Sequence, residues 1–151
     1  MRYLGLDLGT RTLGISISDT TKTIASALKT IRFNDSDYDS ILPELKKIIE
    51  EYEISKIVLG LPKNMNNTTG ERCETTILFQ KKLIDEFNIE VVLQDERLTT
   101  VEATNYMLEA DISRKKRKKK IDSLAANIIL QTYLDREKGG KLWKKKQWLL
   151  K

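Results

Sequence analysis

The chain has no histidine and only one cysteine, Cys73, among its 151 residues. A single cysteine cannot form an internal disulfide, and without histidine the usual zinc sites built from cysteine and histidine are excluded. Ser-His-Asp and Cys-His triads are excluded too, as is a histidine general base. Any catalysis must therefore depend on carboxylates, lysines, hydroxyls or a bound metal ion.

Long apolar runs are also missing. The first residues, 1–7, lack the uninterrupted apolar segment of a signal peptide, and no later stretch approaches the roughly 20 apolar residues that a membrane span requires. Hydrophobic residues make up 40% of the chain and charged residues 32%, which is ordinary for a globular protein of one domain. We therefore expect a cytoplasmic protein with a sizeable core and no membrane partner.

Positive charge is concentrated near the end of the sequence. Residues 1–110 carry 13 Lys and Arg against 18 Asp and Glu, whereas residues 111–151 carry 14 against 4. Seven consecutive basic residues lie in the second region: Arg114, Lys115, Lys116, Arg117, Lys118, Lys119 and Lys120. This asymmetry favours a polyanionic partner such as nucleic acid, and the alternative is an ordinary basic tail.

Residues 3–19 have the pattern of a β-hairpin, with two short apolar strands joined by a turn at 9–12. Hydrophobic periodicity and turn signals predict the later elements. In order, these are a strand at 23–33, candidate N-caps at 34–37, a helix at 38–53, a strand at 57–61, a helix at 71–87, a strand at 90–93, a helix from about 100 to 108, a linker at 111–120 and a helix at 121–134.

Strands that alternate with helices pair in parallel through right-handed crossovers. The order of elements therefore predicts an α/β fold with a mixed five-stranded sheet, in which the first three strands are antiparallel, the last two are parallel, and helices cover both faces. We expect one domain over residues 1–138 and a basic, tryptophan-containing tail over 139–151.

Carboxylates stand at three informative positions. Asp7 interrupts an apolar strand, Asp95 and Glu96 lie just past the predicted strand 90–93, and Asp122 begins an apolar helix. Open α/β sheets bind ligands beyond the carboxyl ends of their parallel strands, so these groups share one edge if the first strand is central. The alternatives are that Asp7 caps the following turn and that Asp122 caps its helix.

Carboxylates that converge without histidine or cysteine suit Mg²⁺ or Mn²⁺, which prefer oxygen ligands. Two such ions about 3.5 to 4 Å apart can activate water and stabilise the leaving oxygen in phosphodiester hydrolysis. The neighbouring basic run would then hold the phosphate backbone. The carboxylates and the lysines together indicate a metal-dependent nuclease.

Four segments resemble the YqgF family, also called RuvX, whose members are bacterial nucleases with the RNase H-like fold. The similarity runs in order over about residues 1–135. Its motifs are Gly5-Leu6-Asp7-Leu8-Gly9-Thr10-Arg11-Thr12-Leu13-Gly14, Val58-Leu59-Gly60-Leu61-Pro62, Asp95-Glu96-Arg97-Leu98-Thr99-Thr100-Val101-Glu102-Ala103 and Lys119-Lys120-Ile121-Asp122-Ser123-Leu124-Ala125-Ala126 through Ile129-Leu130-Gln131.

The resemblance implies a metal-dependent endonuclease that acts in maturation of the 16S ribosomal RNA precursor, with four-way DNA junctions as the alternative substrate. The small ribosomal subunit is then an expected partner, and the protein is a monomer or a homodimer. By matching position, Asp7, Glu96 and Asp122 are the expected metal ligands and catalytic acids, with Asp95 the weaker candidate for the second. Arg11 and Arg97 are expected to hold phosphate, unless each pairs with a neighbouring carboxylate.

Two departures from the family pattern stand out. Asn67, in the loop after Pro62 that is expected to contact substrate, replaces a usual glycine, a mild change because asparagine tolerates left-handed geometry. The tail 139–151 extends past the usual end of the family, and its Trp143 and Trp148 either stack on unpaired bases or fold back onto the domain.

Two other functions compete with the nuclease. One is an RNA-binding ribosome assembly factor without cleavage activity. The other is an ATPase of the actin and sugar-kinase type, whose first hairpin looks similar but which needs two such domains around its nucleotide.

Overall fold

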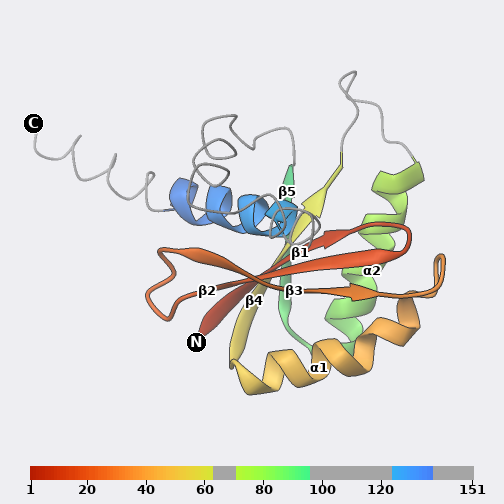
Figure 1. The fold of residues 1–151 in the computed structure, drawn as a ribbon, viewed down its shortest axis with the longest axis horizontal. Helices are drawn as coiled ribbons and strands as arrows, with labels where there is room; N and C mark the ends of the chain where they lie inside the picture. The colour runs from red at the N-terminus through yellow and green to blue at the C-terminus, as the bar shows by residue number, and fades with distance from the viewer. Residues whose placement is uncertain (63–70, 96–123, 138–151) are drawn as a thin grey trace, which may run out of the picture.

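The computed structural model describes residues 1–62, 71–95 and 124–137 (Figure 1). Its named elements are β1 (Arg2–Leu8), β2 (Thr12–Ser18), β3 (Ala25–Arg32), the 3-10 helix η1 (Tyr38–Ile41), α1 (Leu42–Glu51), β4 (Ile54–Leu61), α2 (Glu71–Phe87) and β5 (Glu90–Asp95). Another helix spans residues 124–137. The predicted helix near 100–108, the linker 111–120 and the tail 139–151 lie outside the described ranges.

The strands form one five-stranded sheet in the order β3-β2-β1-β4-β5. β1 pairs antiparallel with β2, and β2 pairs antiparallel with β3. β4 pairs parallel with both β1 and β5. The predicted mixed sheet is confirmed, and β1 is its central strand.

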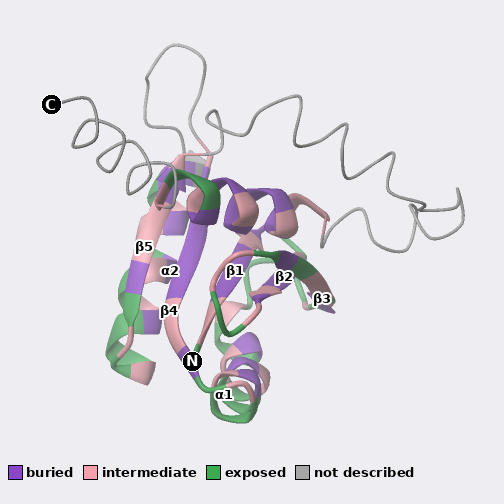
Figure 2. Cartoon of the chain, turned by 90° about the vertical axis from the view of Figure 1, so that its left-hand side faces the viewer, coloured by how far each residue is buried: buried purple, intermediate pink, exposed green. Residues whose placement is uncertain are grey.

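Two helical layers cover the sheet (Figure 1). One face packs against α1 and α2 in a core that includes Leu6, Leu59 and Leu83. The other face packs against the helix 124–137 through Val58, Leu130 and neighbouring apolar residues. Buried residues accordingly line the sheet, and exposed residues lie on the outer sides of α1 and α2 (Figure 2). In the described part of the chain, no helix is long and apolar enough to cross a membrane.

Gly5 sets the distance between β1 and the helix 124–137. A Cβ atom at this position would lie 2.2 Å from Ser16 Oγ and 2.7 Å from Leu130 Cβ. Ser16 Oγ in turn donates a buried hydrogen bond of 2.8 Å to the carbonyl oxygen of Ala126. Small residues on β1 and β2 therefore hold the helix backbone close to the sheet.

The prediction that residues 34–37 cap the first helix is wrong. Asp37 immediately precedes η1, but its side chain forms no capping hydrogen bond. The segment instead folds against the first hairpin, where Phe33 N donates to Arg11 O at 2.9 Å and Ser36 N donates to Thr10 O at 3.2 Å. α1 then begins with proline in its first turn, where the missing N–H costs nothing.

Candidate metal and nucleic-acid site

Asp7 lies on the face of β1 that packs against the helix 124–137. Side chains alternate along a strand, and Leu4, Leu6 and Leu8 belong to the core on the α1 and α2 side. Asp7, which is half-buried, therefore shares the opposite face with Gly5 and Tyr3. It is paired with Gly14 of β2 inside the ladder, beside the turn that Gly9 N closes by donating to Thr12 O at 2.8 Å.

Glycines flank Asp7 on both neighbouring strands. Gly14 is its partner on β2 and itself pairs with Thr30 of β3. On the other side, Leu6 pairs with Leu59, so the next residue of β4, Gly60, lies beside Asp7 and pairs with Gln94 of β5. The carboxylate therefore stands in a row across all five strands in which both neighbours lack a side chain.

Buried polar atoms that lack a partner among the described residues lie at both ends of this row. Thr30 Oγ1 and Gln94 Nε2, at the two ends of the row, form no hydrogen bond with any described residue. The same is true of Asn127 Oδ1, on the helix 124–137 that covers this face of the sheet. Gln94 is only 5% exposed. An atom of this kind that stays unpaired costs about 1 to 3 kcal/mol, so a partner outside the described residues, such as a water or a ligand, is expected here.

The covering helix points its amino end toward Asp7. Tyr133 packs on Tyr3 with ring centroids 6.2 Å apart, whereas Ala126 and Leu130 lie over Gly5, farther along β1. The helix therefore runs antiparallel to β1, and its first turns lie at the carboxyl end of that strand.

Asp95 lies on the opposite face from Asp7. It is the last residue of β5 and pairs with Leu61, so the prediction that the strand ends at residue 93 and that Asp95 lies past it is wrong. The ladder continues for two more residues because β4 extends to Leu61 and supplies partners. Val91 and Leu93 belong to the core on the α1 and α2 side, and alternation puts Asp95 on their side.

Of the other predicted site residues, the structure describes only Arg11. Its side chain is exposed on the hairpin turn, and no carboxylate within the described ranges pairs with it. The described ranges also contain no group of three carboxylates or cysteines suited to a metal ion. The remaining predicted residues lie outside those ranges: Glu96, Arg97, Arg114, Lys115, Lys116, Arg117, Lys118, Lys119, Lys120 and Asp122.

A second polar group lies between the sheet and the helix 124–137, at the amino end of β1. It consists of Lys56, Tyr133 and Glu137, and we call it the closed cluster. Lys56 Nζ donates to Tyr133 Oη at 3.1 Å and lies 3.7 Å from Glu137 Oε1, while Tyr133 Oη donates to Glu137 Oε1 at 2.9 Å. The ammonium also lies 4.9 Å from the centroid of the Tyr3 ring. Burial lowers the pKa of Lys56, but the hydrogen bond to Tyr133 and the carboxylate of Glu137 outweigh it and raise the pKa above its usual value.

Sequence reasoning did not find the row that surrounds Asp7. Gly14 and Gly60 stand out only after the register is known, because nothing in the sequence says which residues lie beside Asp7 on the next strands. Gln94 and Asn127 have no periodic signal either. One signal was available: Gly5, Asp7, Gly14 and Ser16 are small or polar residues at alternate positions of two apolar strands.

Comparison with known proteins identifies the family. Residues 1–136 match the family described as RuvX, Holliday junction resolvase. The chain belongs to the RuvX family. It is 52% identical over 135 residues to a Bacillus subtilis protein named "Putative pre-16S rRNA nuclease", covering 89% of this chain and 98% of that protein. A Clostridium botulinum protein of the same name is 53% identical over 135 residues, covering 89% and 97%.

Solved structures show the fold of this RuvX chain. Thermus thermophilus RuvC in complex with a Holliday junction aligns with a TM-score of 0.57 at 11% identity, covering 92% of this chain and 96% of that one. The fowlpox virus Holliday junction resolvase aligns with a TM-score of 0.56 at 15% identity, covering 90% and 99%. The fold is therefore RNase H-like, as the sequence motifs implied.

Proposed function

We propose that this RuvX chain is a metal-dependent endonuclease that hydrolyses phosphodiester bonds in the 16S ribosomal RNA precursor. One observation carries the proposal: Asp7, on the central strand, is the carboxylate around which both neighbouring strands place glycine, on the face covered by the helix 124–137. The names of the relatives supply the substrate. The proposed setting is the cytoplasm, with the small ribosomal subunit as a partner.

The proposed metal ligands are Asp7, Glu96 and Asp122. Continued alternation past Asp95 would place Glu96 on the face of Asp7, which favours Glu96 over Asp95. Asp122 precedes Leu124, the first described residue of the helix 124–137, by two positions in the sequence. The donor set is oxygen-only and fits Mg²⁺ or Mn²⁺. When bound, a pair of such ions supplies an activated water and stabilises the leaving oxygen.

The chain's own residues have separate tasks in this scheme. The three carboxylates provide fixed negative charge on rigid elements, and the glycines beside Asp7 leave backbone where a phosphate can approach. Arg11 and Arg97 are proposed to hold phosphates next to the scissile bond. Residues 114–120 are proposed to hold the more distant backbone, a contact that adds affinity and salt dependence but no sequence preference.

A second substrate is a four-way DNA junction. The description of the matching family as Holliday junction resolvase favours it. Symmetric cleavage of a junction would call for a homodimer, whereas trimming an RNA requires only a monomer. An RNA-binding assembly factor without cleavage activity is the alternative of a different class.

The test is a cleavage assay with two labelled substrates, a 16S precursor RNA and a four-way DNA junction. Wild type and Asp7→Asn are compared in Mg²⁺, in Mn²⁺ and in EDTA. We expect the RNA to be cut by wild type only with metal, and by the variant not at all. Tight binding of the RNA by both proteins without cleavage of either substrate would contradict the nuclease and support the assembly factor.

A further inference from the structure

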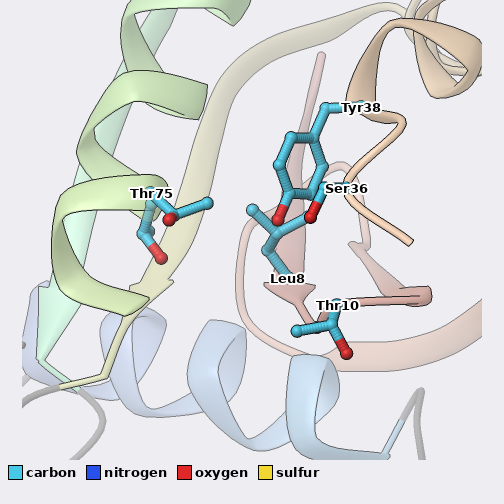
Figure 3. Close-up of a pocket in the computed structure, with 7 residues that line it drawn as sticks. Leu8, Thr10, Ser36, Tyr38 and Thr75 are labelled. Carbon is cyan, nitrogen blue, oxygen red and sulfur yellow. The ribbon is translucent and has the colours of Figure 1, made fainter. Parts of the chain in front are cut away.

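A polar pocket lies at the carboxyl end of β1, on the α1 and α2 side of the sheet. It has a volume of about 210 Å³ and is lined by Leu8, Gly9, Thr10, Ser36, Tyr38, Thr75 and Thr76. Ser36 and Tyr38 lie on one side with their hydroxyls toward Leu8, and Thr75 of α2 lies across from them (Figure 3). These residues come from three separate parts of the chain.

The lining favours a neutral ligand over a phosphate. None of the seven residues is charged, and five carry hydroxyls, which both donate and accept hydrogen bonds. Backbone donors are also engaged, because Gly9 N donates to Thr12 O and Ser36 N donates to Thr10 O. The volume of the pocket is about 210 Å³. This is below the usual size of a drug-sized ligand site and suits one small ring system.

The backbone and neighbouring rings fix the positions of Ser36 and Tyr38, the two hydroxyl residues on one side of the pocket. Ser36 has a left-handed backbone with φ of 61°, which is uncommon for a residue other than glycine. The Tyr38 ring packs between Phe33 and Phe79, with centroid distances of 5.6 and 5.9 Å. A site that is fixed before binding loses less conformational entropy when its ligand arrives.

The pocket and Asp7 lie on either side of the same strand end. Leu8, at the base of the pocket, directly follows Asp7, and successive Cα atoms are about 3.8 Å apart. A nucleic acid strand that crosses this end of the sheet with a phosphate near Asp7 would therefore bring an adjoining nucleotide to the pocket. Unpaired bases can be splayed out of the strand and bound by their polar edges.

We propose that this pocket takes up one unpaired base of the substrate strand, next to the phosphate that is cut. The proposal rests on the proposed nuclease function. Apolar contact comes from Leu8 and the threonine methyls, and the hydroxyls of Ser36 and Tyr38 meet the polar edge of the base. Because a hydroxyl can either donate or accept, the pocket accepts more than one kind of base.

The experiment measures RNA binding by fluorescence anisotropy in the Asp7→Asn background, which prevents cleavage. Single abasic nucleotides are placed in turn around the cleavage position of a labelled precursor RNA. We expect one abasic position to weaken binding roughly three- to tenfold, the effect of a lost hydrogen-bonded group. Tyr38→Phe should weaken binding of the intact RNA similarly and have no further effect on that abasic RNA.

Two further variants and one modified RNA serve as controls for the pocket. Tyr52→Phe makes the same chemical change beside Arg2, at the far end of the sheet, and should leave affinity unchanged. Ser36→Gly removes a pocket hydroxyl while suiting the left-handed backbone, and should reproduce the loss seen with Tyr38→Phe. A 2′-deoxy substitution at the sensitive position should have no effect.

Three results would overturn the pocket. The first is that no abasic position weakens RNA binding. The second is that the abasic position weakens binding by Tyr38→Phe as much as it weakens binding by the protein with Tyr38 intact. The third is that the 2′-deoxy substitution weakens binding and the abasic one does not. If wild type still cleaves the intact RNA in the assay above, only the pocket assignment has failed. If wild type cleaves neither substrate while the abasic and Tyr38→Phe effects coincide, the pocket stands and the nuclease fails.

Discussion

The helix 124–137 covers two very different polar regions on the same face of the sheet. At the amino end of β1, Lys56, Tyr133 and Glu137 satisfy one another through hydrogen bonds and ion pairs. At its carboxyl end, Asp7 stands between glycines, and buried atoms of Thr30, Gln94 and Asn127 have no partner in the described part of the chain. The first region is what stability alone would select. In the second, buried polar atoms lack a partner among the described residues, which a ligand-binding role explains better than stability does.

The strands contribute to this difference as well as the helix, which supplies Tyr133 and Glu137 to the first region. Near Lys56 the neighbouring strands supply large side chains, among them Tyr3, whereas near Asp7 they supply Gly14 and Gly60. Large side chains can satisfy one another's polar groups. Glycines have no side chain and leave backbone that a ligand can approach. We expect substitutions near Asp7 to affect cleavage and substitutions near Lys56 to affect only folding.

The largest effect is expected from neutralising Glu96 compared with its neighbour. Glu96→Gln should lower the single-turnover cleavage rate in Mg²⁺ more than about a hundredfold. This exceeds the usual loss when a residue that only hydrogen-bonds to a metal ligand is replaced. Asp95→Asn should lower the rate less than about tenfold, because Asp95 faces α1 and α2. If Asp95→Asn is the more damaging change, the assignment of faces at the end of β5 is wrong.

Gly5 joins the two regions, and its substitution should damage both. The Cβ of Gly5→Ala would contact Ser16 Oγ and Leu130 Cβ below 3.0 Å, so the helix must shift. Overpacking of this kind costs roughly 1 to 3 kcal/mol, which lowers Tm by about 2 to 12 °C for a chain of this length. Thermal unfolding followed by circular dichroism measures the change.

Gly9→Ala is the matched control for Gly5→Ala. Its Cβ would lie 3.1 Å from Thr12 Oγ1 and 3.2 Å from Thr12 O, at the hairpin turn and away from the helix. A change in Tm of less than half that of Gly5→Ala is expected. Equal losses from the two glycines would show that the close approach of the helix has no special cost.

Lys56→Met tests whether the closed cluster serves folding only. It should lower the free energy of unfolding by roughly 1 to 3 kcal/mol, because it removes a charged hydrogen bond, and leave the Mg²⁺-dependent rate unchanged. The control Lys82→Met breaks an exposed pair with Asp39 and should cost less than about 1 kcal/mol. A selective loss of cleavage in Lys56→Met would contradict the division into two regions.

The pH dependence of the Lys56 contribution follows from its raised pKa. A cation whose pKa is higher in the folded state stabilises fully below the unfolded value, here 10.5, and loses that contribution as pH rises through the folded pKa. The difference in stability between wild type and Lys56→Met should therefore be constant from neutral pH to about pH 10 and shrink above it. Chemical denaturation across this range provides the measurement.

The smallest effect is expected at the β2–β3 turn. Hydrogen bonds from the side chain of Thr21 and from the backbone N–H groups of Thr23 and Ile24 lower the pKa of Asp19 to about 2 from 3.8. Its contribution to stability is thus complete above 3.8 and is lost as pH falls through about 2. Asp19→Asn should lower Tm by a few degrees at neutral pH, and the gap should close in acid. A gap that persists at pH 2 would contradict this.

The sheet could be predicted from the sequence because each strand has a local signal. The alternation of Leu13, Ile15 and Ile17 and the continuous apolar run 57–61 fixed strand type, and the order of elements fixed the pairing directions. The caps at 34–37 were mispredicted because the same polar residues suit a loop that folds against the hairpin. Nothing local distinguishes these two uses.

The site was only partly predictable, for a related reason. Asp7 was identified because a carboxylate in an apolar strand is conspicuous by itself. Its neighbours Gly60 and Gln94 are separated from it by more than 50 residues and become neighbours only through the register of β4 and β5. The base pocket likewise combines hydroxyls from three distant segments, none with a spacing that sequence reasoning could detect.

We propose that the carboxyl end of β1, under the helix 124–137, forms a divalent cation site that includes Asp7. The most direct measurement is titration of Mn²⁺ by electron paramagnetic resonance with wild type, Asp7→Asn and Asp95→Asn. We expect wild type to bind Mn²⁺ saturably, and Asp95→Asn to bind it with an affinity within about threefold of wild type. Asp7→Asn should bind Mn²⁺ at least about tenfold more weakly. Equal Mn²⁺ affinity in wild type and Asp7→Asn, with both proteins folded, would contradict it.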